Sequence, residues 1–223
     1  LIVEAMGVTE CKGVATAGVE PDDDSEEVEP EYLDEKETTL FRSLAARGNY
    51  VAFDRPDIAY AVKECSWETA KPTQHSWEKL RRLAKYLRGK PRFVWKLHWQ
   101  DMVDCLDTYT DANWAGCKAT RRSTSGGVIM AGSHTLKFWS NTQSTTALSS
   151  AKSELFASVK GGSESLGMMA LLEDLGAQVK TRLHMGASAA IGIAQRQGVG
   201  KIRHLSTSIL WIQKQELRHA LAT

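Results

Sequence analysis

The chain has 223 residues, of which 42% are hydrophobic and 25% charged. This composition excludes a chain that is disordered along its whole length, and the length suffices for one large or two small domains. Its formal net charge of +1 hides an uneven distribution. Residues 1–40 hold 13 acidic and 2 basic side chains, whereas the rest of the chain holds 14 acidic and 26 basic ones. A basic body suits a phosphate-binding surface, although solvated basic faces also occur without nucleic acid.

The cysteines and the apolar runs limit the classes of protein further. The four cysteines show neither C-x-x-C spacing nor a companion histidine cluster, so we expect no zinc or redox motif and a reducing, intracellular compartment. No apolar run approaches the roughly 20 residues of a membrane span. Leu1 to Glu4 lack the basic start of a secretory signal, and without an initiating Met the chain is expected to be a segment of a longer protein.

The first part of the chain predicts an acidic linker followed by helices. Residues 20–37 are acidic and bracketed by prolines, which indicates a solvated spacer. A metal-binding role for residues 22–24 is the weaker alternative, because the spacing of a calcium loop is missing. Helices are predicted over residues 38–66 and 74–89. The second starts after Pro72 and Thr73, and it ends at Gly89, just before Pro91.

From residue 92 the pattern changes to short alternating runs, which are typical of strands. Strands are expected at residues 93–99, 103–109, 127–131, 135–139 and 178–184. Helices are expected at residues 149–175, near 187–197 and near 205–218. Three strands, a helix, a strand and a helix predict an α/β fold whose sheet carries helices on its faces.

Several consecutive blocks resemble, in their order, the C-terminal part of the Pol polyprotein of copia-type LTR retrotransposons. The blocks are Met6 to Gly18, Phe41 to Leu44, Asn49 to Ala52, Arg55 to Ile58, Leu80 to Gly89, Tyr109 to Gly116, Arg121 to Gly127 and Ala147 to Ser150. The most specific are Tyr109 to Gly116 and Arg121 to Gly127. The resemblance covers nearly the whole chain.

The resemblance implies a ribonuclease H-like mixed sheet with flanking helices at residues 92–223. Before it would come the end of the reverse transcriptase region at 1–19, the acidic linker at 20–37 and a helical connection at 38–91. Enzymes of this fold cleave the RNA strand of RNA/DNA hybrids with two magnesium ions. The family's last strand and helix are expected beyond residue 223, so the sheet should have an unpaired edge.

The resemblance also assigns the metal ligands. The first carboxylate falls on Asp111 and the second on Glu154, whereas Gly186 stands where the third belongs, and the fourth is expected beyond Thr223. Two magnesium ions carry four positive charges that oxygen ligands must hold against the substrate phosphate. With two of four carboxylates absent, we expect no magnesium cofactor and no hydrolysis, that is, a pseudoenzyme.

Alternatives remain at this site. Asp111 and Glu154 are either ordinary polar residues, which we favour, or a remnant that binds one magnesium ion weakly. Asp107 is not an obvious substitute ligand from its place in the strand. We expect His184, at a strand end, to be structural rather than a ligand or a base.

Basic side chains predict contacts with nucleic acid, although solvated charges explain them equally well. They are Arg81, Lys85 and Arg88 on the helix at 74–89, and Arg121 and Arg122 on the turn between the first two strands. The main hypothesis is an inactive ribonuclease H relic that binds RNA/DNA hybrid weakly. The alternatives are an accessory subunit that docks with other protein chains in a larger assembly and a residually active nuclease.

Overall fold

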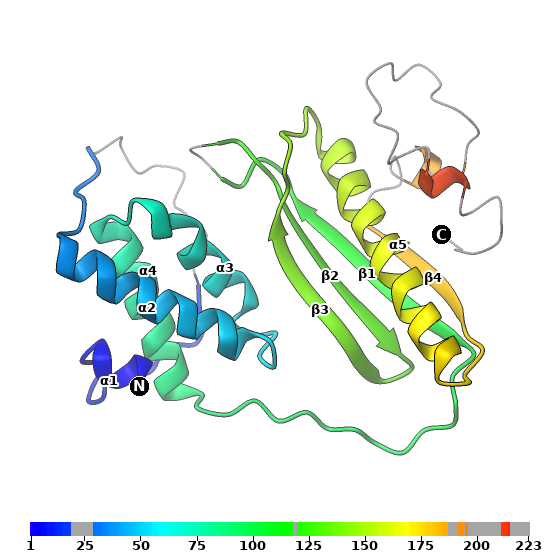
Figure 1. The fold of residues 1–223 in the computed structure, drawn as a ribbon, viewed down its shortest axis with the longest axis horizontal. Coiled ribbons are helices and arrows are strands. Elements are labelled where there is room, and N and C mark those ends of the chain that lie inside the picture. Colours follow the sequence, from blue (N-terminus) through cyan, green and yellow to red (C-terminus); the bar gives the residue numbers. More distant parts are fainter. Residues whose placement is uncertain (19–28, 118–119, 187–190, 194, 196–210, 215–223) are drawn as a thin grey trace. The chain divides into compact units, whose positions relative to one another are not determined.

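The computed structural model describes residues 1–18, 29–117, 120–186, 191–193, 195 and 211–214. The chain divides into two compact units, Leu1–Trp95 and Lys96–Thr223 (Figure 1). The domain boundary predicted at residues 91 and 92 lies just before this division. None of the described helices combines the length and the apolar character that a membrane span requires.

The first unit is helical. Its elements are α1 (Ile2–Ala5), α2 (Glu35–Ala52), α3 (Ala59–Trp67), a 3-10 turn (Glu68–Ala70) and α4 (Gln74–Gly89). The single helix predicted over residues 38–66 is therefore wrong. The break between α2 and α3 contains Pro56, whose missing N–H and fixed φ disfavour a helix interior.

Helix α2 starts within the stretch that was predicted to be an acidic linker. A carboxylate oxygen of Asp34 accepts a hydrogen bond from the backbone N–H of Glu37 at 2.7 Å, and the Glu37 side chain accepts one from the Asp34 backbone at 3.3 Å. This reciprocal capping box satisfies two backbone donors at the helix start. Residues 35–37 thus belong to α2, and residues 20–28 of the predicted linker lie outside the described part.

Helix α4 begins and ends where the sequence predicts. Thr73 caps its N-terminus in a second capping box with Ser76, and the helix ends at Gly89. Its apolar face joins a core shared by the N-terminal segment, α2 and α3. The fully buried members of this core include Val8, Phe41, Leu44, Ile58 and Leu80. Residues 1–18 therefore pack with the connection helices.

A buried ion pair ties the break between α2 and α3 to the end of α4. The Arg55 guanidinium donates two hydrogen bonds to Asp57, at 2.8 and 2.9 Å, and a third to the carbonyl of Lys90 at 3.0 Å. The Tyr86 hydroxyl donates to the same carboxylate at 2.8 Å. These donors, led by Arg55, hold the pKa of Asp57 below its usual value despite its burial.

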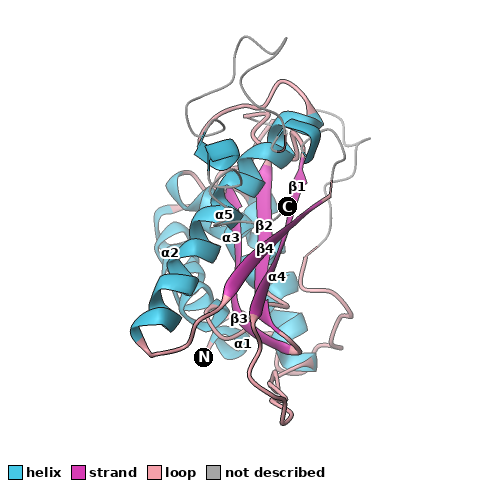
Figure 2. Cartoon of the chain, turned by 90° about the vertical axis from the view of Figure 1, so that its right-hand side faces the viewer, coloured by secondary structure: helices cyan, strands magenta, loops and turns pink. Residues whose placement is uncertain are grey.

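The second unit is a mixed sheet covered by one long helix (Figures 1 and 2). Its elements are β1 (Cys105–Asn113), β2 (Thr124–Ala131), β3 (His134–Thr142), α5 (Ser150–Asp174) and β4 (Lys180–Met185). The strand order is β3-β2-β1-β4, with β1 antiparallel to β2 and parallel to β4. The predicted α/β fold with a mixed sheet and a flanking helix is confirmed.

One expectation for this part of the chain differs from the structure, and another lies largely outside the described residues. The strand predicted at residues 93–99 is wrong, because these residues are irregular and pair with no described strand. Alternation alone does not form a strand, since the backbone also needs a partner. Of the helices expected near 187–197 and 205–218, residues 191–193 and 211–214 are helical. Most of the remaining residues of both segments lie outside the described part.

Helix α5 packs on the sheet through small and hydroxyl-bearing residues. The Thr108 hydroxyl of β1 donates to Ser165 Oγ at 3.0 Å, which satisfies both groups in the buried interface. Gly161 lies so close to β1 that a Cβ atom on it would come within 2.3 Å of Thr110 Cγ2. The close approach brings the first turns of α5 to the end of β1.

Candidate active site

The two predicted carboxylates lie where β1 ends and α5 begins. Asp111 is exposed near the end of β1, where it pairs with Gly126 of β2. Helix α5 starts after Ser149, whose hydroxyl accepts a hydrogen bond from the Lys152 backbone at 3.2 Å. This start places Glu154 in the second turn, where only 8% of the residue is exposed.

Gly186 immediately follows β4 and lies beside both carboxylates. A Cβ atom placed on Gly186 would be 3.7 Å from Asp111 Oδ1 and 3.8 Å from each carboxylate oxygen of Glu154. The structure therefore brings together all three positions that the sequence resemblance assigned. The third position supplies no side chain.

Glu154 lies in a site that disfavours its charge. Its Oε1 accepts a 3.3 Å hydrogen bond from the Ala112 backbone N–H, while Oε2 is buried without a partner among the described residues. Burial raises the pKa of Glu154, the negative charge of Asp111 raises this pKa further, and the Ala112 N–H partly opposes both effects. A buried carboxylate oxygen without a donor favours protonation or a cation in its place.

The ligands present do not fit a two-magnesium centre. Magnesium prefers near-octahedral coordination by oxygen atoms, and a pair of ions needs bridging carboxylates from several directions. Asp111 and Glu154 supply two carboxylates, and Gly186 supplies none. Within the described ranges, no three His, Cys, Asp or Glu side chains group so that they could hold a metal ion.

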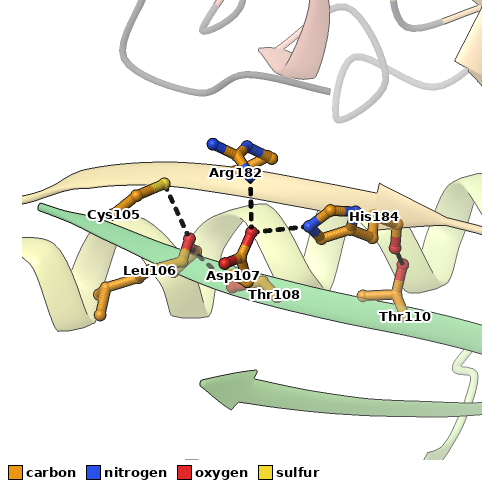
Figure 3. A network of polar contacts seen from close by, with 8 residues as sticks. Cys105, Leu106, Asp107, Thr108, Thr110, Arg182 and His184 are labelled. Atoms are coloured by element: carbon orange, nitrogen blue, oxygen red, sulfur yellow. Dashed lines mark hydrogen bonds and ion pairs between the residues drawn. The ribbon is translucent and has the colours of Figure 1, made fainter. Parts of the chain in front are cut away.

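A polar cluster on β1 and β4 was not predicted (Figure 3). One carboxylate oxygen of Asp107 lies 2.7 Å from His184 Nε2 and 3.4 Å from Arg182 Nη1. The His184 ring stacks on Tyr109 with 4.4 Å between the ring centroids. Alternation along each strand shows that these side chains can share a face, but their pairing depends on the register between β1 and β4. Asp107 and His184 bind each other instead of completing the carboxylate pair.

The predicted nucleic-acid contacts lie in both units. On α4, Arg81 pairs with Glu78 at 3.4 Å, and Arg88 donates to the backbone carbonyl of Thr9. Lys85 lies one turn from each of these arginines on the same helix side.

Arg121 and Arg122 belong to the turn between β1 and β2. Their backbone bonds to Cys117 close this turn: the Arg121 N–H donates to the Cys117 carbonyl at 2.7 Å, and the Cys117 N–H donates to the Arg122 carbonyl at 3.1 Å. Arg121 adopts a left-handed φ of 52°. This backbone fixes where the two side chains leave the turn.

Comparison with known proteins shows similarity to retrotransposon polyproteins. It is 33% identical over 141 residues to the retrovirus-related Pol polyprotein from transposon RE2 of Arabidopsis thaliana, a match that covers 63% of this chain and 10% of that protein. It is 27% identical to the Pol polyprotein from transposon TNT 1-94 of Nicotiana tabacum, over 72% of this chain and 12% of that protein. No family model matches the chain.

Among solved structures, the LC11-RNase H1 isolated from compost is similar, with a TM-score of 0.40 and 18% identity over 54% of this chain and 82% of that chain. The chain spans about a tenth of the length of the polyproteins that it matches. The homologous blocks occur together with a mixed sheet and a carboxylate pair at the end of β1. The homologues of this chain are therefore copia-type, retrovirus-related Pol polyproteins from transposons.

Proposed function

We propose that the second unit is a ribonuclease H-like domain that no longer hydrolyses RNA. The observation that carries this proposal is the glycine at position 186, beside two carboxylates that need a third ligand to hold divalent cations. A glycine has no side chain that a change of rotamer could bring into the site. The domain descends from an enzyme for RNA/DNA hybrids and retains its scaffold without its metal centre.

A cleavage assay tests the loss of hydrolysis. The full chain is incubated with an end-labelled RNA/DNA hybrid in magnesium and, separately, in manganese. We expect intact RNA in both. Cleavage that disappears in the Asp111→Asn variant would show an active site in the chain and would overturn the proposal.

Restoring the missing carboxylate tests its cause. Gly186→Asp should create a cation site with Asp111 and Glu154, because the new Cβ has ordinary contact distances to both carboxylates. A cation at about 100 times its Kd stabilises the folded state by about 2.7 kcal/mol, which calorimetry detects as a higher Tm.

The matched control is Gly186→Asn, which has nearly the same size and no charge. We expect manganese to raise the Tm of Gly186→Asp and to leave the parent chain and Gly186→Asn unchanged. An equal rise in the parent chain would mean that Asp111 and Glu154 already hold the ion. That result would contradict the proposed cause.

The accessory role in a larger protein assembly stays a prediction, as does the reducing intracellular compartment. Native mass spectrometry of the chain from its source tissue checks the accessory role. A stoichiometric protein partner would establish this role, and isolation of the chain alone would count against it.

A further inference from the structure

A cavity of about 290 Å³ lies within the first unit, between α3, α4 and the N-terminal segment. Its volume is close to the lower end of the range of small-molecule pockets, about 300 Å³. One wall is apolar and the other is basic. The apolar wall includes Val14, Ala17 and Ala61, and the basic wall consists of Lys79, Arg82 and Lys85 on successive turns of α4.

Two carboxylates also line the cavity, and each has a basic partner outside the lining. Glu78 pairs with Arg81 at 3.4 Å, and Glu64 forms an ion pair with Lys63. These two glutamates therefore pair with Lys63 and Arg81 and not with the basic residues of the cavity lining.

The basic side chains of the wall differ in what they bind. Lys79 Nζ pairs with Glu68 at 2.5 Å. Arg82 donates from Nη2 to the hydroxyl of Thr16 at 2.8 Å, and its Nε is buried without an acceptor. Within the part of the chain that the structure describes, neither Arg82 nor Lys85 has a carboxylate partner. Two cations without a described carboxylate partner thus line a cavity that has an apolar wall.

This combination distinguishes the site from a solvated helix face. Cations that only solubilise a helix need no cavity, whereas Arg82 and Lys85 line one that also has an apolar wall. An arginine and a lysine together match the charge of a phosphate group. Tyr60 adds an aromatic side chain to the lining, of the kind on which a nucleobase stacks, with the Lys63 ammonium 5.0 Å from its ring centroid.

We propose that this cavity binds a small organic phosphate of the nucleoside monophosphate class. The phosphate contacts Arg82 and Lys85, and the nucleoside lies against the apolar wall and Tyr60. The test is independent of the proposed loss of hydrolysis, since all the residues involved belong to the first unit.

Calorimetric titration of the full chain at low salt tests the proposal, with adenosine monophosphate as the probe. Adenosine and inorganic phosphate are titrated separately, because each offers only half of the recognised chemistry. We expect saturable binding of the monophosphate, with each half at least about tenfold weaker. Absence of saturation by the monophosphate at millimolar concentration would overturn the proposal. Equal binding of inorganic phosphate alone would do the same, since it would reveal a plain anion site.

Two variants test the walls separately. Arg82→Gln combined with Lys85→Gln should weaken binding at least about tenfold, while Arg47→Gln, an exposed basic residue on α2, serves as the control and should not change it. Ala17→Leu keeps every charge and fills the cavity, so it should also abolish binding.

Circular dichroism melting accompanies each variant, and if Ala17→Leu unfolds early, the charge variant carries the test. An equal loss of affinity in the Arg47→Gln variant would show that binding depends on general charge attraction, and it would overturn the proposed site. Unchanged binding in a folded Ala17→Leu variant would show that the ligand does not bind in the cavity.

Discussion

Glu154 combines burial with a neighbouring carboxylate, and both effects favour its neutral form. Its pKa in the folded protein lies above the ordinary value of 4.5. Folding therefore favours the protonated carboxyl. The stabilisation is fully present below the pKa of the unfolded chain and is lost as the pH rises through the raised pKa of the folded state. Glu154 therefore contributes less to the stability of the second unit at neutral pH than in acid.

We predict that Glu154→Gln raises the Tm at pH 7 and leaves it unchanged at pH 4 or below. The amide is always neutral, and its oxygen can still accept the hydrogen bond from Ala112. A gain of about 1 kcal/mol would correspond to roughly 2–4 °C in a protein of this size. Calorimetry of the full chain in the presence of a chelator measures the difference at both pH values.

Glu173→Gln is the control for this change, because Glu173 is exposed near the end of the same helix. It should leave the Tm nearly constant at both pH values. A lower Tm for Glu154→Gln at pH 7 would mean that the folded protein stabilises the charged carboxylate, contrary to the effect of burial described above.

The sequence alone predicted the carboxylate pair of Asp111 and Glu154, but it did not predict the polar cluster on β1 and β4. Asp111 and Glu154 each lie in a short block whose order along the chain is specific to the family. Asp107 and His184, in contrast, are 77 residues apart and meet only through the parallel register of β1 and β4. No local pattern encodes that register, because it follows from how α5 carries the chain back to the sheet.

At the level of elements, two glycines of α5 should respond in opposite ways to the same substitution. Gly161→Ala would place its Cβ 2.3 Å from Thr110 Cγ2 and 3.1 Å from Leu183 Cδ1, both in the buried interface with the sheet. We predict a loss of about 1–3 kcal/mol, as for other overpacked cores. Gly167→Ala meets nothing within 4 Å, so it should stabilise the helix by up to about 1 kcal/mol.

Chemical denaturation of the full chain, followed by circular dichroism, measures both changes. Each of the two variants is the control for the other, because both replace a glycine of α5 by alanine and only the packing around the new Cβ differs. Stabilisation by Gly161→Ala would show that α5 does not lie as close to β1 as described.

The elements that were predicted well carry their own boundary signals. Helix α4 has a Thr73 cap and Gly89 at its end, and α5 ends just before Gly176, which adopts a left-handed φ of 86°. The helix predicted over residues 38–66 is wrong because Pro56 lies in the break between α2 and α3. The strand predicted at 93–99 failed because alternation says nothing about a partner.

For the whole molecule, basic side chains exceed acidic ones after residue 40, as a surface that binds nucleic acid requires. We predict that the chain binds an RNA/DNA hybrid weakly and that Arg121→Gln combined with Arg122→Gln weakens the salt dependence of this binding. Each phosphate contact contributes about −0.9 to the slope of log K against log salt for B-form DNA, so the slope should become shallower by roughly 2.

Filter binding at several salt concentrations gives the slope, and Arg47→Gln is the matched control on the first unit. An unchanged slope in the double variant would exclude the turn between β1 and β2 from the contact surface. No binding by the parent chain at low salt would remove the hypothesis of residual affinity altogether.

The identity of residue 186 also determines how many base changes separate this chain from one that has the third carboxylate. A glycine codon that ends in a pyrimidine becomes an aspartate codon by one transition at its second base. The surrounding residues leave ordinary contact distances for a Cβ atom at this position. Where the Gly186 codon has that form, a single base change separates the chain without the third carboxylate from one that carries it.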